Sequence, residues 1–112
     1  MAKDCIFCKI AKHEIPKEFI FETEDVMVFS DIHPVAPVHL LLVPKKHITE
    51  FTRIGKSDKK IWEEMVEILR ELIKKYKLTK KGYRVVTNGG GAQLIDHFHV
   101  HLMGGISQKR KF

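Results

Sequence analysis

The chain has 112 residues, the usual size of one domain, and we expect a single domain over residues 1–112. Its net charge of +6 favours anionic ligands such as nucleotides or phosphates. The basic residues are scattered, and only residues 109–111 form a dense basic run, which disfavours a nucleic-acid site. No run approaches the ~20 apolar residues that cross a bilayer, and the N-terminus has too short an apolar run for a secretory signal. The sequence thus predicts no membrane association and a cytoplasmic location.

Residues 5–16, CIFCKIAKHEIP, predict a short turn or helix that ends before Pro16, because the residue preceding a proline avoids the α region. Cys5 and Cys8 form a C-x-x-C motif, which in a cytosolic protein indicates metal or redox chemistry. The redox interpretation lacks the strand that should precede the motif. A zinc site needs two more ligands, and only histidines are available because the chain has no third cysteine. Zinc is favoured, with free thiols and redox chemistry as alternatives.

Two strands are expected next, at residues 18–23 (EFIFET) and 26–31 (VMVFSD), because both are rich in β-branched and aromatic residues. The two acidic residues between them predict a tight turn, and hence a hairpin. Residues 31–37, DIHPVAP, form a loop, since two prolines cannot contribute to a ladder. Residues 38–44, VHLLLVP, are almost continuously apolar and predict a central strand covered on both faces.

One long helix is expected over residues 58–77, with Ser57 as its N-cap. Its apolar residues recur at helical spacing and form one stripe: Ile61, Met65, Ile68, Leu69, Leu72, Ile73 and Tyr76. Further strands are expected at residues 82–88 and 97–103, separated by the loop NGGGAQ. The sequence therefore predicts an α+β fold with a short N-terminal helix, an antiparallel sheet of about five strands, and one long helix on one face.

The run HFHVHLM places histidines at three alternate positions: His97, His99 and His101. On a strand all three share one face, and the apolar residues between them share the other. The apolar face suits the long helix, so the histidines point away from it. Neighbouring histidines would lie ~6.6 Å apart and could share a metal or have separate roles. A metal site, a catalytic surface and plain solvated histidines are the three interpretations.

These residues fit the pattern H-φ-H-φ-H-φ-φ, where φ is hydrophobic, and so resemble the histidine-triad (HIT) family of nucleotide hydrolases and transferases. The resemblance covers nearly the whole chain. It includes the N-terminal CIFCKI, the EIP at residues 14–16, and the segment FSDIHPVAPVHLLLVPKKHI at residues 29–48, which is similar to the Hint-like branch. It implies the HIT-like fold and a hydrolase acting on purine nucleotides.

The resemblance implies that His99 attacks the α-phosphorus of an AMP derivative, such as a phosphoramidate or a dinucleoside polyphosphate, and that water hydrolyses the nucleotidyl-histidine. A neutral imidazole is a good nucleophile near pH 7. His101 would lie near the phosphate and leaving group, His39 would face the same pocket, and Asp31 would bind the ribose hydroxyls. Further residues match the base pocket (Phe7, Ile10, Ile15, Phe29 and Ile32) or the surroundings of the phosphate (Asn88 and Gln93). As alternatives, the apolar residues and His39 could be core, and Asp31 could be only a turn former.

The resemblance also implies one structural zinc per chain, with a closed Cys₂His₂ ligand set: Cys5, Cys8, His47 and His97. It further implies a homodimer formed through the sheet and long helix, where Trp62 would suit an interface or the core. The sequence departs from the family at Leu94, where the Hint-like branch commonly has a serine or threonine that helps to protonate the leaving group. Asp96 also stands where an aromatic or apolar residue is usual.

Three hypotheses follow from these patterns. The first is a nucleotide hydrolase acting through His99. The second is a non-catalytic zinc-containing domain that binds nucleotides or RNA. The third is an enzyme with zinc on the triad itself, which would leave Cys5 and Cys8 without a role.

Overall fold

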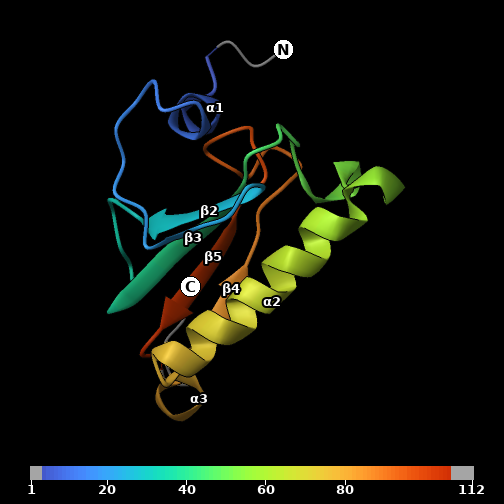
Figure 1. Cartoon of the computed structure of the whole chain (residues 1–112). Coiled ribbons are helices and arrows are strands. Elements are labelled where there is room, and N and C mark those ends of the chain that lie inside the picture. The colour runs from blue at the N-terminus through green and yellow to red at the C-terminus, as the bar shows by residue number, and fades with distance from the viewer. Residues whose placement is uncertain (1–3, 107–112) are drawn as a thin grey trace.

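The computed structural model describes residues 4–106 and has an α+β fold, with one long helix against a five-stranded sheet (Figure 1). The helices and strands in chain order are α1 (Ile6–Ala11), β1 (Phe21–Glu22), β2 (Val26–Ser30), β3 (Val38–Pro44), α2 (Lys59–Lys75), α3 (Leu78–Lys81), β4 (Tyr83–Val86) and β5 (Val100–Gly104). Two 3₁₀ turns, Phe51–Arg53 and Lys56–Asp58, precede α2. The predicted fold class is confirmed. Within the described residues, no helix has the length and apolar character needed to cross a bilayer.

The sheet is antiparallel throughout, with strand order β1-β2-β3-β5-β4. The predicted hairpin of the first two strands is confirmed, although β1 is shorter than residues 18–23. Phe19 packs on Phe29, on the same side of the sheet as α1. The bounds predicted for β3 agree with those observed, and β3 is a central strand between β2 and β5.

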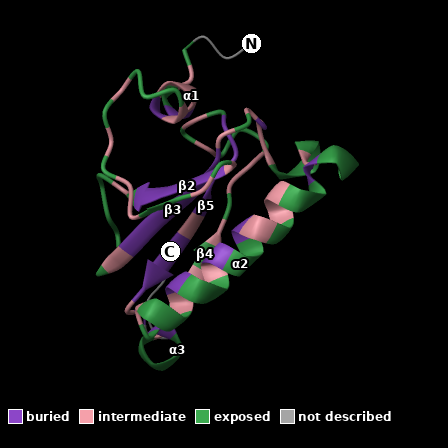
Figure 2. Ribbon diagram, viewed as in Figure 1, coloured by how far each residue is buried: buried purple, intermediate pink, exposed green. Residues whose placement is uncertain are grey.

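The central strands β2 and β3 are buried on both faces, which explains the nearly continuous apolar run of β3 (Figure 2). Leu40 and Leu42 belong to the core under α2, whereas Leu41 and Val43 belong to a second cluster on the side of α1. Each fully buried aliphatic side chain contributes roughly 1.5–3 kcal/mol relative to an exposed one. The second cluster is the smaller one, and it packs Phe7 and Ile10 of α1 against side chains of β2 and β3.

The long helix starts and ends slightly inside the predicted range of residues 58–77. Its N-cap is Asp58, so the prediction of Ser57 was wrong. Ser57 lies instead in the 3₁₀ turn, and the Asp58 carboxylate accepts hydrogen bonds from the backbone of Gly55 and from Lys46. Lys77 has φ +56°, which ends the helical path, and the short helix α3 follows it. The sequence pattern did not reveal α3, which buries Leu78 completely.

The histidine strand is shorter at its start than residues 97–103. His97 lies in a bend, His99 follows in extended chain, and regular pairing begins at Val100. The alternation of sides nevertheless holds, because Phe98 and Val100 pack in the core under α2. The backbone N–H of Phe98 donates to the carbonyl of Ile48 rather than to a neighbouring strand. The three histidines therefore face away from α2, as predicted, and Phe7 of α1 packs on two of them. Only the last of them lies within the ladder.

Candidate active site and metal centre

Two cysteines and two histidines from three distant segments converge beside α1. The Nδ1 atom of His97 lies 3.2 Å from Sγ of Cys5, 3.6 Å from Sγ of Cys8 and 3.1 Å from Nδ1 of His47. The Sγ atom of Cys8 lies 3.3 Å from Nδ1 of His47. A tetrahedral zinc ion would hold its ligands at S···N distances of about 3.5 Å and an N···N distance of about 3.3 Å. The four donors therefore have the spacing and chemistry of a closed Cys₂His₂ site.

The tautomer of His97 supports this assignment. Its Nε2 lies 2.7 Å from the carbonyl oxygen of Pro44, a position that an N–H must occupy. The proton is thus on Nε2, and the lone pair of Nδ1 faces the two cysteines, as in most metal-binding histidines. Burial lowers the pKa of His97 to about 4, so the ring is neutral. Burial, followed by the neighbouring Cys5, raises the pKa of Cys8 to about 11, so a cation is needed to hold that sulfur as thiolate.

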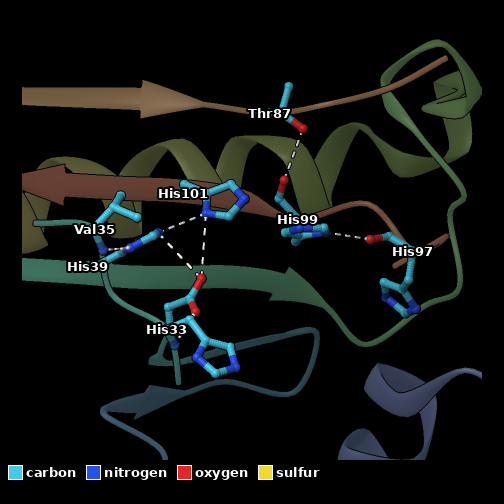
Figure 3. Close-up of polar contacts among 8 residues, drawn as sticks. His33, Val35, His39, Thr87, His97, His99 and His101 are labelled. Atoms are coloured by element: carbon cyan, nitrogen blue, oxygen red, sulfur yellow. Dashed lines mark hydrogen bonds and ion pairs between the residues drawn. The ribbon is translucent and has the colours of Figure 1, made fainter. Parts of the chain in front are cut away.

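The second triad histidine is oriented by the first. The Nδ1 atom of His99 lies 2.8 Å from the backbone oxygen of His97, so this nitrogen carries a proton and donates it (Figure 3). The carbonyl of His99 in turn accepts from the hydroxyl of Thr87 at 2.9 Å. Phe7 of α1 packs edge-on against both rings, with centroid distances of 5.6 Å to His97 and 5.2 Å to His99. In the neutral ring, this hydrogen bond places the lone pair on Nε2, as a nucleophilic histidine requires.

His39 and His101 form a second hydrogen-bonded pair (Figure 3). The backbone N–H of Val35 donates to Nδ1 of His39 at 3.1 Å, so the proton of neutral His39 is on Nε2. That Nε2 donates to Nδ1 of His101 at 2.9 Å and lies 3.4 Å from Oδ2 of Asp31. Since Nδ1 of His101 accepts a hydrogen bond, its Nε2 carries a proton that it can donate to a ligand.

The same three side chains, Asp31, His39 and His101, lie close enough together to suggest a second metal site. The contact with Val35 argues against it. A metal on Nε2 of His39 would move the proton to Nδ1, where it would oppose the N–H of Val35. This cluster is better described as a hydrogen-bonded relay that fixes the tautomer of His101.

A pocket of about 420 Å³ opens in front of the histidines. Its residues are Ile6, Phe7, Ile10, Lys17, Phe29, Ser30, Asp31, Ile32, His33, Leu41, Asn88, Ala92, Leu94, Ile95, His99 and His101. Part of the lining is apolar, with side chains that include Phe7 and Ile10 of α1 and Phe29 of β2. The rest is polar and includes Asp31, Asn88 and three histidines, His33, His99 and His101. Such a mixed lining suits a ligand that has both a flat apolar group and an anionic group.

Most of the predicted pocket residues lie together, but three of them are placed elsewhere. Ile15 packs against the cluster on the side of α1 and does not line the pocket. His39 lies behind His101, with 6% of its surface exposed. Gln93 also lies outside the lining, because its side chain accepts from the N–H of Gly91 and donates to Asp96.

Eight lining residues were not among the predicted site residues: Ile6, Lys17, Ser30, His33, Leu41, Ala92, Leu94 and Ile95. Lys17 lies over the ring of Phe29, with its Nζ 5.1 Å from the ring centroid, and adds a cation to the apolar part. Its position between α1 and β1 gave no signal in the sequence. Leu94 lines the pocket with its side chain fully exposed at 101%. A fully exposed leucine indicates a ligand site only when the pocket beside it is already known.

The pKa of His101 provides a test of the relay. Burial, followed by the charges of His99 and His39, lowers the pKa of His101 to about 4, whereas the unfolded chain binds this proton at about pH 6.5. The unfolded state therefore binds more protons between these values. The free energy of unfolding should be highest above pH 6.5 and should fall as the pH is lowered towards 4.

Thermal melts of the wild type and of His101→Gln between pH 7 and pH 4.5 test this expectation. The wild type should lose more stability over this range than the variant. Loss of metal at low pH affects both proteins and cancels in the comparison. Equal pH dependence in the two proteins would contradict the assignment of a neutral, buried His101.

Comparison with known proteins places this arrangement in a family. Residues 4–111 match the family model described as scavenger mRNA decapping enzyme C-term binding. An uncharacterised HIT-like protein of Buchnera aphidicola is 40% identical over 102 residues, covering 89% of this chain and 91% of the relative. Protein HitA of Neisseria gonorrhoeae is 38% identical and covers 90% and 95%. The fold and the alternating histidines are those of a histidine-triad domain. The chain belongs to the HIT family.

Solved structures agree with this assignment. A HIT family hydrolase from Clostridium thermocellum has a TM-score of 0.88 and 36% identity, covering 100% of this chain and 99% of that one. A HIT family hydrolase from Legionella pneumophila has a TM-score of 0.85 and 40% identity, covering 93% and 95%. A histidine triad nucleotide-binding protein from Candida albicans has a TM-score of 0.78 and 36% identity, covering 88% and 73%.

Proposed function

We propose that the protein is a nucleotide hydrolase that transfers the nucleotidyl group of a purine nucleotide derivative, through its α-phosphorus, to His99 and then to water. The observation that carries the proposal is the hydrogen bond from Nδ1 of His99 to the backbone oxygen of His97, at 2.8 Å. It leaves the Nε2 lone pair unprotonated beside a pocket with one apolar and one polar part. Similar proteins are described as hydrolases and as nucleotide-binding, which supports this class of reaction.

The pocket suggests how such a substrate would bind. The base would lie between apolar side chains such as Phe7, Ile10 and Phe29, and the ribose would face Asp31. The α-phosphate would then lie at the polar end, near Asn88 and the histidines. The bond from Nε2 of His99 to phosphorus forms as the bond to the leaving group breaks, and His101 donates a hydrogen bond to a phosphoryl oxygen. Water then cleaves the nucleotidyl-histidine and restores His99.

A zinc ion held by Cys5, Cys8, His47 and His97 would supply structure rather than chemistry in this scheme. It would fix the ring of His97 from one side while Pro44 holds it from the other. The backbone oxygen of the same residue orients His99. The metal site would thus help to orient His99, because the residue that binds the metal, His97, also supplies the backbone oxygen that holds the ring of His99.

Leu94 narrows the choice of leaving group. Its side chain cannot donate a proton, so the leaving group would take its proton from solvent. A leaving group that needs little protonation should therefore react better than a basic alkyl amine. We propose AMP phosphoramidates with weakly basic amines, or dinucleoside polyphosphates, as the substrate class.

Asp31 should discriminate ribose from deoxyribose. The Asp31→Ala variant is expected to raise KM for an AMP phosphoramidate by about tenfold or more, because hydrogen bonds to a charged group contribute about 1.5–3 kcal/mol. The same change should have little effect on the 2′,3′-dideoxy substrate. Steady-state kinetics with both substrates measure this. An equal rise in KM for both would contradict a ribose contact and favour a purely structural role in the turn with His33.

The direct test of the proposed function is hydrolysis of an AMP phosphoramidate by the purified protein, together with calorimetry of AMP binding. We expect turnover and release of AMP. Tight AMP binding without turnover of phosphoramidate, polyphosphate or sulfate derivatives would instead favour a non-catalytic nucleotide-binding domain.

We also propose a homodimer. The edge strand β4 exposes Tyr83 and Val85, at 42% and 45%, and α2 exposes Val66 at 37%. Trp62 is half-buried and packs against Phe98 and Phe51, so it belongs to the core at least in part. Sedimentation analysis of the wild type would decide the oligomeric state.

A further inference from the structure

Glu50 connects two segments that lie far apart in the sequence, the 3₁₀ turn Phe51–Arg53 and the loop between β4 and β5. It caps the 3₁₀ turn Phe51–Arg53, because Oε2 accepts from the backbone N–H of Thr52 at 2.8 Å and from the Thr52 hydroxyl. Its other oxygen, Oε1, accepts from the backbone N–H of Gly90 at 3.0 Å, 40 residues further along the chain. The carboxylate therefore joins this turn to the loop between β4 and β5.

The contact with the loop is close as well as hydrogen-bonded. A Cβ atom on Gly89 would lie 2.8 Å from Oε1 of Glu50, so the carboxylate would have to shift if position 89 carried a side chain. The loop is the one that leads from β4 to the histidines, and Asn88 and Ala92 at its two ends line the pocket. The glycines between them have positive φ at Gly90 and Gly91, so the loop has little intrinsic preference for one shape. Glu50 supplies a fixed point for it.

The segment that carries Glu50 is itself held firmly. His47 belongs to the metal centre, and the carbonyl of Ile48 accepts from the N–H of Phe98, next to the nucleophile. Residues 47–50 therefore contact the metal centre, the histidine segment and the glycine loop in turn. Glu50 thus lies at the end of a segment whose position is fixed by tertiary contacts. Its carboxylate can therefore hold the loop in one position.

We propose that Glu50 is a positioning residue that holds the glycine loop so that Asn88 faces the phosphate of the bound nucleotide. The inference rests on the proposed function of the pocket and adds to it a residue outside the pocket. Glu50 does not touch the substrate. It acts through the Gly90 N–H and the loop, and its effect should therefore be confined to the phosphate end of the ligand.

A double-mutant cycle between Glu50 and Asn88 tests this proposal. Calorimetry would measure the affinities of the metal-loaded protein for AMP and for adenosine in the wild type, Glu50→Ala, Asn88→Ala and the double variant. We expect Glu50→Ala to weaken AMP binding by about tenfold and to leave adenosine binding unchanged. Because Glu50 acts through Asn88, the double variant should bind AMP no more weakly than Asn88→Ala.

Two further variants are matched controls. Glu50→Gln keeps an oxygen for the Gly90 N–H and should retain AMP affinity within about threefold. Thr52→Val removes a hydroxyl that contacts the same carboxylate but not the loop, and it should behave like the wild type. Metal content and melting temperature should be unchanged in all five variants.

The proposal would be overturned by equal losses of AMP and adenosine affinity, which indicate general loosening, or by additive effects in the cycle. It would also be overturned if Glu50→Ala bound AMP as the wild type does. The proposed function is judged separately, by turnover of the wild type, since the affinity cycle needs no catalysis.

Discussion

The His99→Ala variant is expected to lower kcat for an AMP phosphoramidate by about 10⁴-fold or more. It removes the ring nitrogen on which the hydrogen bond to the backbone oxygen of His97 leaves the lone pair. AMP binding should persist, since the apolar part of the pocket and Asp31 are unchanged. Metal content should also persist, since His97 keeps its contact with Pro44. Steady-state kinetics, calorimetry and metal analysis measure the three quantities.

His33 provides a matched control for this prediction. It lines the same pocket but is exposed, and no side-chain hydrogen bond ties it to the other histidines. The His33→Asn variant should therefore retain kcat within about threefold, as is usual for exposed positions away from such contacts. Substantial turnover in His99→Ala, or a comparable loss in His33→Asn, would show that another group performs the attack.

The second large effect is expected at the metal centre. The Cys5→Ser variant should bind zinc far more weakly and melt at least about 10 °C below the wild type, because binding of a structural metal contributes directly to folding. The loss should be greater in His97→Ala, which also removes the hydrogen bond to Pro44. Native mass spectrometry would count zinc per chain, and thermal melts would record stability.

Chelation separates the loss of stability caused by losing the metal from any other effect of these substitutions on stability. A strong chelator should bring the wild type down to the melting temperature of Cys5→Ser and have no further effect on that variant. Zinc retained at one per chain in Cys5→Ser would refute the Cys₂His₂ assignment and favour a site on the remaining histidines.

The strands and the side on which the histidines lie were predictable because both follow from alternation. Apolar residues between the histidines had to pack against the long helix, and they do so even where the ladder has not begun, at Phe98. The start of the strand was not predictable. It depends on a single backbone contact with Ile48, 50 residues away, and on the turning of His97 towards Pro44.

The roles of the histidines came from resemblance rather than from spacing. The alternation of the histidines alone did not show whether neighbouring histidines share a metal ion. The structure separates them physically, since His97 faces Cys5 with one nitrogen and Pro44 with the other, whereas His99 has neither contact. Which nitrogen of each ring carries the proton depends on backbone carbonyls and N–H groups whose positions no sequence pattern encodes.

The residues missed by the sequence are those that act through tertiary contacts. Glu50 follows the motif PKKHI and resembles any exposed acidic residue until the Gly90 N–H is seen beside it. Lys17 lies in an irregular segment between α1 and β1 and lines the pocket with its Nζ over the ring of Phe29. Gln93 shows the opposite outcome. Its position in the sequence predicted a contact with the phosphate, whereas its side chain hydrogen-bonds to Gly91 and Asp96 in its own loop.

The most direct test of the central claim is rapid-quench mass spectrometry of the intact protein within milliseconds of mixing with an AMP phosphoramidate. The account predicts a transient adduct of one AMP group per chain, mapped by proteolysis to His99, that forms and decays at rates consistent with kcat. Turnover with no adduct at any time, or an adduct on a residue other than His99, would contradict it.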